Sequence, residues 1–219
     1  MRISVRFAPS PTGYLHVGGL RTALYNYLYA KGENGRIVLR IEDTDQSRKV
    51  EGAVEQLISA FDVMGIQFDE SPENEGNYGP YFQSQRLGLY KKHVTELVQK
   101  GLAYPCFCSS ERLDTLRKEK QALKLSTQYD RHCLSLTKDE IEGKYKSESH
   151  VFRLKIPDSK SITFNDMVRN NVTFSTEEID DQILLKSDGF PTYHLANVVD
   201  DYHMGITHVI RGEEWLPST

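Results

Sequence analysis

A strand that breaks into a proline- and glycine-rich loop and then enters a helix is the feature that most constrains this fold. Residues 5–19 read V-R-F-A-P-S-P-T-G-Y-L-H-V-G-G. Such a helix start presents unpaired backbone N–H groups and the positive end of the helix dipole, which together bind anions such as phosphate. Gly18 and Gly19 let the backbone approach a ligand closely, and His16 adds a hydrogen-bond donor. The glycine spacings of dinucleotide-binding and P-loop motifs are missing, so a purely structural turn is the alternative.

Hydrophobic periodicity predicts the elements around this loop. After the loop, an apolar stripe at helical spacing is expected to face a core, and it comprises Leu20, Ala23, Leu24, Tyr27 and Leu28. Further amphipathic helices are predicted over 53–64 and 87–97, and short alternating strands over 152–156, 162–164 and 172–174.

A second segment, residues 36–48, reads R-I-V-L-R-I-E-D-T-D-Q-S-R. Its near-continuous apolar start predicts a central parallel strand that is covered on both faces. The strand ends at Glu42, Asp43 and Asp45, and open α/β sheets bind ligands at the carboxyl ends of their strands. A solvated acidic turn that caps the next helix is the alternative.

A third segment, residues 187–216, combines polar side chains with a predicted helix and strand. Tyr193 and Asn197 are four residues apart on the helix, so their side chains point to one side. A short strand predicted over 206–210 delivers Arg211, and Glu213 and Glu214 open another helix. Taken alone, the tyrosine fits an ordinary core and the arginine fits a surface ion pair.

Together these segments carry a family resemblance. The runs T-G-Y-L-H-V-G-G and L-R-I-E-D-T-D and the segment 187–216 resemble, in the same order, the motifs of glutamyl-tRNA synthetases, which are class I aminoacyl-tRNA synthetases. Glutaminyl-tRNA synthetases usually show P-P-E-P-N-G where this chain has A-P-S-P-T-G. The shorter relatives that glutamylate a modified tRNA base usually show I-E-D-x-D-P-P-R, whereas this chain has I-E-D-T-D-Q-S-R.

The resemblance implies an α/β fold with the Rossmann-like, nucleotide-binding parallel sheet of class I synthetases. This catalytic domain would consist of residues 1–80 and 187–219. An α+β insertion, residues 81–186, would divide it and contact the acceptor end of tRNA. The chain is expected to be an N-terminal catalytic fragment, because the lysine-rich K-M-S-K-type loop and the anticodon-binding domain of the family have no counterpart in it.

The resemblance also implies roles for individual residues. The catalytic residues would be His16, Gly18 and Gly19, which would bind ATP and stabilise charge on its phosphates. Glu214 would lie near the adenosine. L-Glutamate would bind through a set of six residues, in which two arginines and a tyrosine hold the γ-carboxylate and the others orient the α-amino and α-carboxylate end. These six are Arg6, Arg211, Tyr193, Ser10, Glu42 and Asn197.

The implied reaction has two steps. L-Glutamate reacts with ATP, with Mg²⁺ present, to give glutamyl-adenylate and pyrophosphate, and the glutamyl group then passes to the 3′ end of tRNA. The fragment alone is expected to be weakly active or inactive. The alternatives are a glutamate-binding module without catalysis and the relative that glutamylates a tRNA base.

Composition adds few constraints. A net charge of −4 lacks the basic footprint of a nucleic-acid binder, so the tRNA partner is implied by the resemblance alone. A basic run over 112–124 fits a solvated helix face better than a phosphate-binding patch. The mean hydropathy is −0.52, no apolar run approaches the about 20 residues of a bilayer span, and no signal peptide is recognisable. We therefore expect a cytoplasmic monomer that does not enter membranes.

The chain has three cysteines, Cys106, Cys108 and Cys133. Some bacterial members of the family bind zinc through C-x-C, 24 intervening residues and C-x-H, and the interval of 24 residues is present here. The fourth position departs from the pattern, because Ser135 stands where the histidine is expected. Tyr129, His132 or water are the candidate substitutes, and inert buried thiols are the alternative.

Overall fold

The structure is a computed structural model that describes residues 2–218. It divides into two compact units. The first combines Met1–Tyr90 with Phe190–Thr219, and the second comprises Lys91–Gly189. The assignment of one part to catalysis and the other to tRNA contact stays a prediction.

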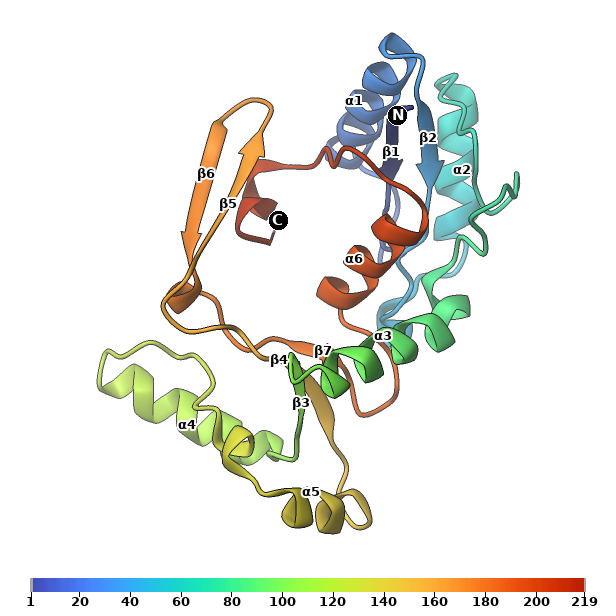
Figure 1. Cartoon of the computed structure of the whole chain (residues 1–219). Helices are drawn as coiled ribbons and strands as arrows, with labels where there is room; N and C mark the ends of the chain where they lie inside the picture. The colour runs from blue at the N-terminus through green and yellow to red at the C-terminus, as the bar shows by residue number, and fades with distance from the viewer. Residues whose placement is uncertain (1, 219) are drawn as a thin grey trace. The chain divides into compact units, whose positions relative to one another are not determined.

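The first unit is built on a β-α-β motif, as the sequence predicts. Strand β1 (Ser4–Phe7) leads through the loop into α1 (Val17–Gly32), and β2 (Arg36–Leu39) returns parallel to β1. Two single parallel bridges, Val38 to Glu70 and Ile41 to Phe82, extend the sheet beyond these strands. The carboxyl ends of β1 and β2 therefore meet at the same edge, beside the start of α1 (Figure 1).

The two faces of this sheet have different covers. Phe7 and Leu39 pack with α1 and with α2 (Ala53–Val63) in one hydrophobic core. On the opposite face, Val38 packs against Met204, which follows α6 (Tyr193–His203). Side chains alternate along a strand, so Arg6 and Arg40 also face α6. On this face, the apolar side chain of Val38 in β2 is followed by the charged side chain of Arg40, just after the strand ends.

The predicted core-facing stripe of α1 is partly wrong. Ala23 is fully buried, but Leu24 and Leu28 are 39% and 56% exposed. The buried residues of the helix are Ala23, Asn26 and Ala30, because small side chains let the helix approach the sheet closely. Asn26 satisfies its amide nitrogen by donating to the backbone oxygens of Thr22 and Ile210.

The strand predicted over 206–210 is also wrong, because this segment has irregular backbone. The N–H groups of Thr207 and His208 both donate to the oxygen of Ser4, at 2.8 and 3.2 Å. Two consecutive amides that share one carbonyl cannot continue a strand ladder. The helix expected at Glu213 is present as a 3₁₀ helix, Glu213–Ser218.

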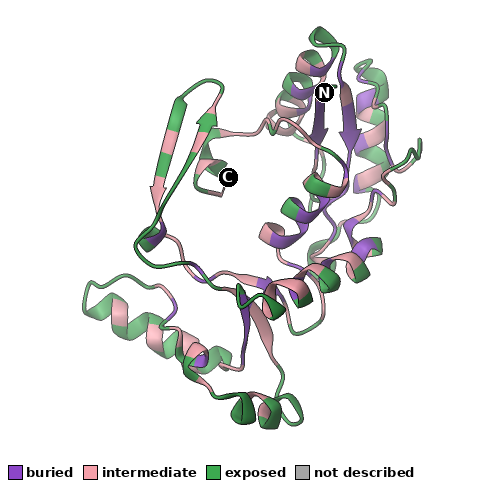
Figure 2. Cartoon of the chain, viewed as in Figure 1, coloured by how far each residue is buried: buried purple, intermediate pink, exposed green. Residues whose placement is uncertain are grey.

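The second unit holds a three-stranded antiparallel sheet and a separate hairpin. The helices are α3 (Leu87–Gln99), which leads into the unit, α4 (Ser110–Ala122) and α5 (Lys138–Tyr145). The strands are β3 (Ala103–Cys106), β4 (Val151–Leu154), β5 (Ser161–Asp166), β6 (Asn170–Ser175) and β7 (Ile183–Leu185). The strands predicted from alternation are confirmed as β4, which ends two residues earlier than predicted, β5 and β6. Figure 2 shows that β3 is buried, whereas the hairpin β5–β6 is mostly exposed.

Within residues 2–218, each helix is too short or too polar to cross a lipid bilayer.

Candidate active site and thiol cluster

A cavity of about 480 Å³ lies in the first unit, at the carboxyl ends of β1 and β2. The start of α1, one side of α6 and the segment around residues 210–215 complete its walls. Every residue predicted for the glutamate and ATP sites lines this cavity: Arg6, Ser10, His16, Gly18, Gly19, Glu42, Tyr193, Asn197, Arg211 and Glu214. The structure brings these residues together, while their individual roles stay predictions.

The start of α1 is organised by His16. Its Nδ1 accepts a hydrogen bond from the backbone N–H of Gly18 at 3.1 Å, and its backbone oxygen accepts from Leu20. In a neutral ring the proton is then on Nε2, which remains a donor. A Cβ on Gly18 would lie 2.9 Å from His16 Cε1, so glycine lets the ring fold over the helix start. The first turn carries no acidic residue, which leaves the positive helix end uncompensated.

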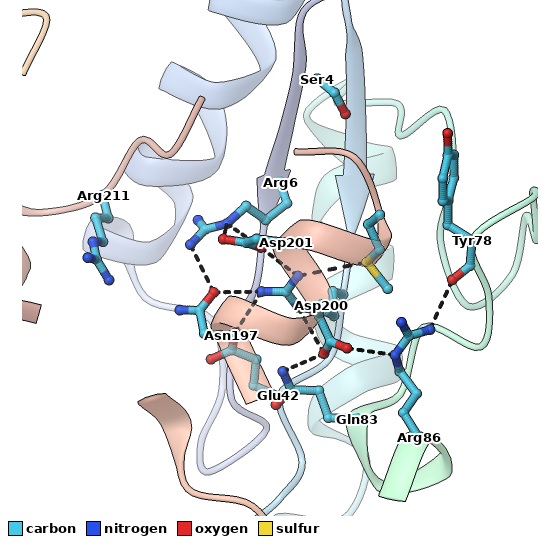
Figure 3. A network of polar contacts seen from close by, with 12 residues as sticks. Ser4, Arg6, Glu42, Tyr78, Gln83, Arg86, Asn197, Asp200, Asp201 and Arg211 are labelled. Atoms are coloured by element: carbon cyan, nitrogen blue, oxygen red, sulfur yellow. Dashed lines mark hydrogen bonds and ion pairs between the residues drawn. The ribbon is translucent and has the colours of Figure 1, made fainter. Parts of the chain in front are cut away.

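The opposite wall carries a buried polar network. Arg6 is 5% exposed, and its Nε lies 3.1 and 3.2 Å from the two carboxylate oxygens of Asp201. Its Nη2 donates to Asn197 Oδ1 at 3.3 Å. Figure 3 shows Arg6, Asn197, Asp201 and Glu42 close together in this network. The network fixes one arginine and one amide that border the cavity.

Glu42 is a buried carboxylate of the cavity wall. Arg40 Nη2 lies 3.2 Å from its Oε1. Burial raises the pKa of Glu42, although the charges of Arg40 and Arg6 oppose that rise and Asp201 adds to it. An ammonium group that enters the cavity would favour the ionised form of this carboxylate.

A second arginine approaches the cavity from the segment after residue 210. Arg211 Nη1 donates to the hydroxyl of Tyr193 at 2.8 Å. The ring of Trp215, the only tryptophan of the chain, lies 5.3 Å from the Tyr193 ring and also lines the cavity. Its fluorescence is therefore a natural reporter of ligand binding at this site.

The acidic turn after β2 divides into two parts. Glu42 lines the cavity, whereas Asp43 accepts hydrogen bonds from the backbone and hydroxyl of Ser84. Asp45 pairs with exposed Arg48. The alternative of a solvated turn therefore describes Asp45, although its side chain does not cap the next helix, whereas Asp43 is buried.

Sequence reasoning missed Arg40, Asp200 and Asp201, which belong to the polar network behind the cavity wall, and Trp215 and Arg21, which line the cavity. The sequence does contain a signal for Arg40, because an arginine within an apolar run of a strand is buried only together with polar partners. The aspartates also follow Asn197 at helical spacing on α6, on the side that faces β2. Neither pattern says by itself which residues meet.

The three cysteines form a cluster in the second unit. Their Sγ atoms all lie within 4.8 Å of one another, and those of Cys108 and Cys133 are 3.6 Å apart. The hydroxyl of Tyr129 lies 3.4 Å from the Cys106 sulfur and 3.3 Å from the Cys108 sulfur. Three thiols and a phenol thus bring four donor atoms close enough together to be candidate ligands of one metal ion.

His132, another candidate for the fourth ligand, and Ser135, which stands where the family has a histidine, make other contacts. His132 is exposed, and its backbone N–H donates to Asp130. The hydroxyl of Ser135 donates to the backbone oxygen of His132. Of the two side chains that were candidates for the fourth ligand, Tyr129 is the one whose contacts with the cysteine sulfurs are established; Arg112 Nη1 also lies 3.5 Å from the Cys108 sulfur.

Comparison with known proteins agrees with this geometry. A family model described as tRNA synthetases class I (E and Q), catalytic domain, matches residues 2–219. The chain is 53% identical to the glutamate–tRNA ligase of Alkaliphilus metalliredigens and 51% identical to that of Clostridioides difficile. These matches cover 99% and 100% of this chain, respectively, and 46% of the length of each relative. The chain thus spans about half the length of the curated relatives it matches.

A solved structure gives the same result. The glutamate tRNA ligase from Elizabethkingia meningosepticum, in complex with its amino acid, superposes with a TM-score of 0.95 at 43% identity. That match covers 100% of this chain and 45% of the other. The predicted class I α/β fold is confirmed, and the chain belongs to the family of class I glutamyl- and glutaminyl-tRNA synthetase catalytic domains.

Proposed function

We propose that this chain is the glutamate-activating part of a glutamate–tRNA ligase. L-Glutamate and ATP would bind side by side in the cavity of the first unit. An oxygen of the α-carboxylate attacks the α-phosphate, pyrophosphate leaves, and the glutamyl group of the adenylate then passes to the 3′ end of tRNA. The observation that supports this most is one cavity whose lining combines three arginines, two glutamates and a helix N-terminus.

The amino-acid end of the cavity suits glutamate. Arg211, with the Tyr193 hydroxyl beside it, and Arg6 are the groups that would hold the γ-carboxylate, because a guanidinium binds a carboxylate through two parallel hydrogen bonds. Glu42 would hold the α-ammonium group, and Asn197 and Ser10 would orient the α-carboxylate. Glutamine would place a neutral amide against two cations, so the site discriminates by charge.

The nucleotide end of the cavity suits a triphosphate. The N-terminus of α1, with His16, Gly18 and Gly19, would stabilise charge on the phosphates, and Glu214 would lie near the adenosine. Transfer at phosphorus depends on positioning and charge neutralisation, so this wall needs no covalent nucleophile. Mg²⁺, when bound with ATP, supplies further neutralisation of the phosphates.

An adenylate analogue tests both ends of the cavity at once. The non-hydrolysable glutamyl-sulfamoyl adenosine should bind roughly a hundredfold tighter than L-glutamate, because it joins two ligands that otherwise bind separately. Trp215 fluorescence follows the titration, and the glutaminyl analogue is the matched control. If the glutamyl analogue binds no tighter than glutamate, the cavity has no adenosine site, and a glutamate-binding module describes the chain better.

Glutamate binding should weaken as the pH falls toward the raised pKa of Glu42, because the ammonium of the ligand prefers an ionised partner. The decline begins above the ordinary glutamate value of about 4.3. For folding the sign is opposite, since a raised pKa in the folded state favours folding as the pH falls. Titrations of the wild type and Glu42→Gln between neutral and acidic pH measure the effect.

Glu42→Gln should bind glutamate more weakly at neutral pH and show a flatter pH profile. The ionisation of the ligand is common to both proteins and cancels in the comparison. Equal slopes for the two proteins would remove Glu42 from the ammonium site.

We also propose that the thiol cluster binds Zn²⁺ through Cys106, Cys108, Cys133 and Tyr129, as a structural ion of the second unit. Protein purified without chelator should contain about one zinc ion per chain. Cys133→Ser should lose the metal, and Tyr129→Phe should weaken its retention. Ser135→Ala is the matched control and should keep it. A metal-to-protein ratio near zero in the wild type would end this proposal.

For the second unit we propose contact with the acceptor end of tRNA. The relatives named as glutamate–tRNA ligases support this partner. The monomeric state and the cytoplasmic location stay predictions.

A further inference from the structure

Arg40 is fully buried and does not line the cavity, yet it holds residues that do. It follows β2 directly and points toward α6. Its Nη2 donates to Asn197 Oδ1 at 2.9 Å and lies 3.2 Å from Glu42 Oε1. One nitrogen thus joins two cavity residues that come from different elements.

The other terminal nitrogen of Arg40 reaches a third cavity residue indirectly. Arg40 Nη1 donates to Asp201 Oδ1 at 2.7 Å. The same carboxylate accepts from Arg6 Nε at 3.1 and 3.2 Å. Asp201 therefore bridges the two arginines and fixes the one that borders the cavity.

The planar shape of the guanidinium is what this arrangement uses. Its donors have fixed directions, so Glu42, Asn197 and Asp201 can be held at once only in one relative geometry. A lysine ammonium carries the same charge, but it presents its donors from a single point on a flexible stem.

We infer that Arg40 and Asp201 are positioning residues of the amino-acid site: they hold Glu42, Asn197 and Arg6 in the arrangement that receives the substrate. The inference rests on the proposed function for the identity of the ligand, and on the geometry above for the role of the two residues.

Arg86 offers a matched control within the same charge cluster. It is also buried, and its Nε lies 2.7 Å from Asp200, whose other oxygen lies 3.8 Å from Arg40 Nε. Its Nη1 donates to the backbone oxygen of Tyr78 (Figure 3) and to that of Pro80, and neither residue lines the proposed substrate cavity. Arg86 thus supports the fold from the side of the cluster that faces away from the site.

The experiment compares Arg40→Lys with Arg86→Lys by calorimetric titration with L-glutamate, well below the unfolding midpoints of both. Arg40→Lys should raise Kd about tenfold or more, because small misplacements of binding groups are costly. Arg86→Lys should change Kd by no more than about twofold, because its hydrogen bonds go to Asp200 and to backbone oxygens and none goes to a residue that lines the cavity. Equal losses in both variants, or wild-type affinity in Arg40→Lys, would overturn the positioning role.

Asp201→Asn is a second variant, because Asp201 is partly exposed and its replacement is easier for the fold to accept than that of Arg40. If Asp201 positions Arg6, its loss weakens glutamate binding. If it only offsets charge, its loss strengthens binding of the anionic ligand, and the inference is wrong.

Crystal structures of the two lysine variants give a readout that needs no ligand. Glu42 and Asn197 should be displaced in Arg40→Lys and unmoved in Arg86→Lys. Failure of the wild type to bind glutamate would contradict the proposed function alone, whereas unmoved side chains in Arg40→Lys would contradict the positioning role alone.

Discussion

Replacing Arg211 with alanine should weaken L-glutamate binding by roughly a hundredfold, the loss expected when one partner of a desolvated charge pair is removed. The side chain reaches the cavity from the irregular segment after residue 210, and its Nη1 donates to the Tyr193 hydroxyl at 2.8 Å. The fold of β1, β2 and α6 does not depend on it, so the thermal unfolding midpoint should change little. Calorimetric titration gives the affinity, and circular dichroism gives the midpoint.

Two controls sharpen this experiment. Arg211→Lys keeps the charge and should recover part of the affinity, because a single ammonium cannot form the paired hydrogen bonds of a guanidinium. Arg48→Ala removes an exposed arginine that pairs with Asp45 and should have no effect on binding. Wild-type affinity in Arg211→Ala would exclude this arginine from the glutamate site.

Replacing Asp200 with alanine should have the largest effect on stability, a loss of about 3–5 kcal/mol in the free energy of unfolding. Asp200 is completely buried and accepts hydrogen bonds from Gln83, Arg86 and Tyr90 at 2.7 to 2.9 Å. Without it, a buried arginine and two buried polar groups lose their acceptor. Figure 3 shows Asp200 between Gln83 and Arg86, away from Arg211.

Urea unfolding measures this loss, with Asp45→Ala as the control. Asp45 belongs to an exposed pair, so its removal should leave the free energy of unfolding nearly unchanged. A small effect of Asp200→Ala would mean that the carboxylate contributes little beyond what water could replace. In that case the polar face of the sheet would not hold α6 in place.

The sequence predicts the framework of the first unit because its signals are local. The apolar run before Glu42 and the proline–glycine loop before His16 predict a parallel strand and a strand-to-helix junction, and both are present. The error in α1 has a physical cause. Small residues such as Ala23 and Ala30 occupy the contact with the sheet, which leaves the larger Leu24 and Leu28 outside. Hydrophobicity alone does not indicate that preference.

The cavity residues could be named from motifs, but their support could not. Arg6 and Asp201 are far apart in the chain and meet only because β1 and α6 pack together. The same holds for Arg40 and Asn197. The strand predicted over 206–210 is wrong because the amides of this segment bond irregularly to β1. That contact is long-range, and the local alternation of side chains does not indicate it. In the second unit, the cysteine spacing makes a shared metal site one of two alternatives, and only the fold shows that the three sulfurs and the Tyr129 hydroxyl lie together.

The measurement that tests the account most directly is calorimetric titration of the wild-type chain with L-glutamate and, in parallel, with L-glutamine. We predict saturable binding of one glutamate, and binding of glutamine that is about a hundredfold weaker, because the amide leaves the two arginines without a counter-charge. Glutamine binding that is equal or tighter, or a chain that binds neither amino acid, would contradict the assignment of this cavity to glutamate.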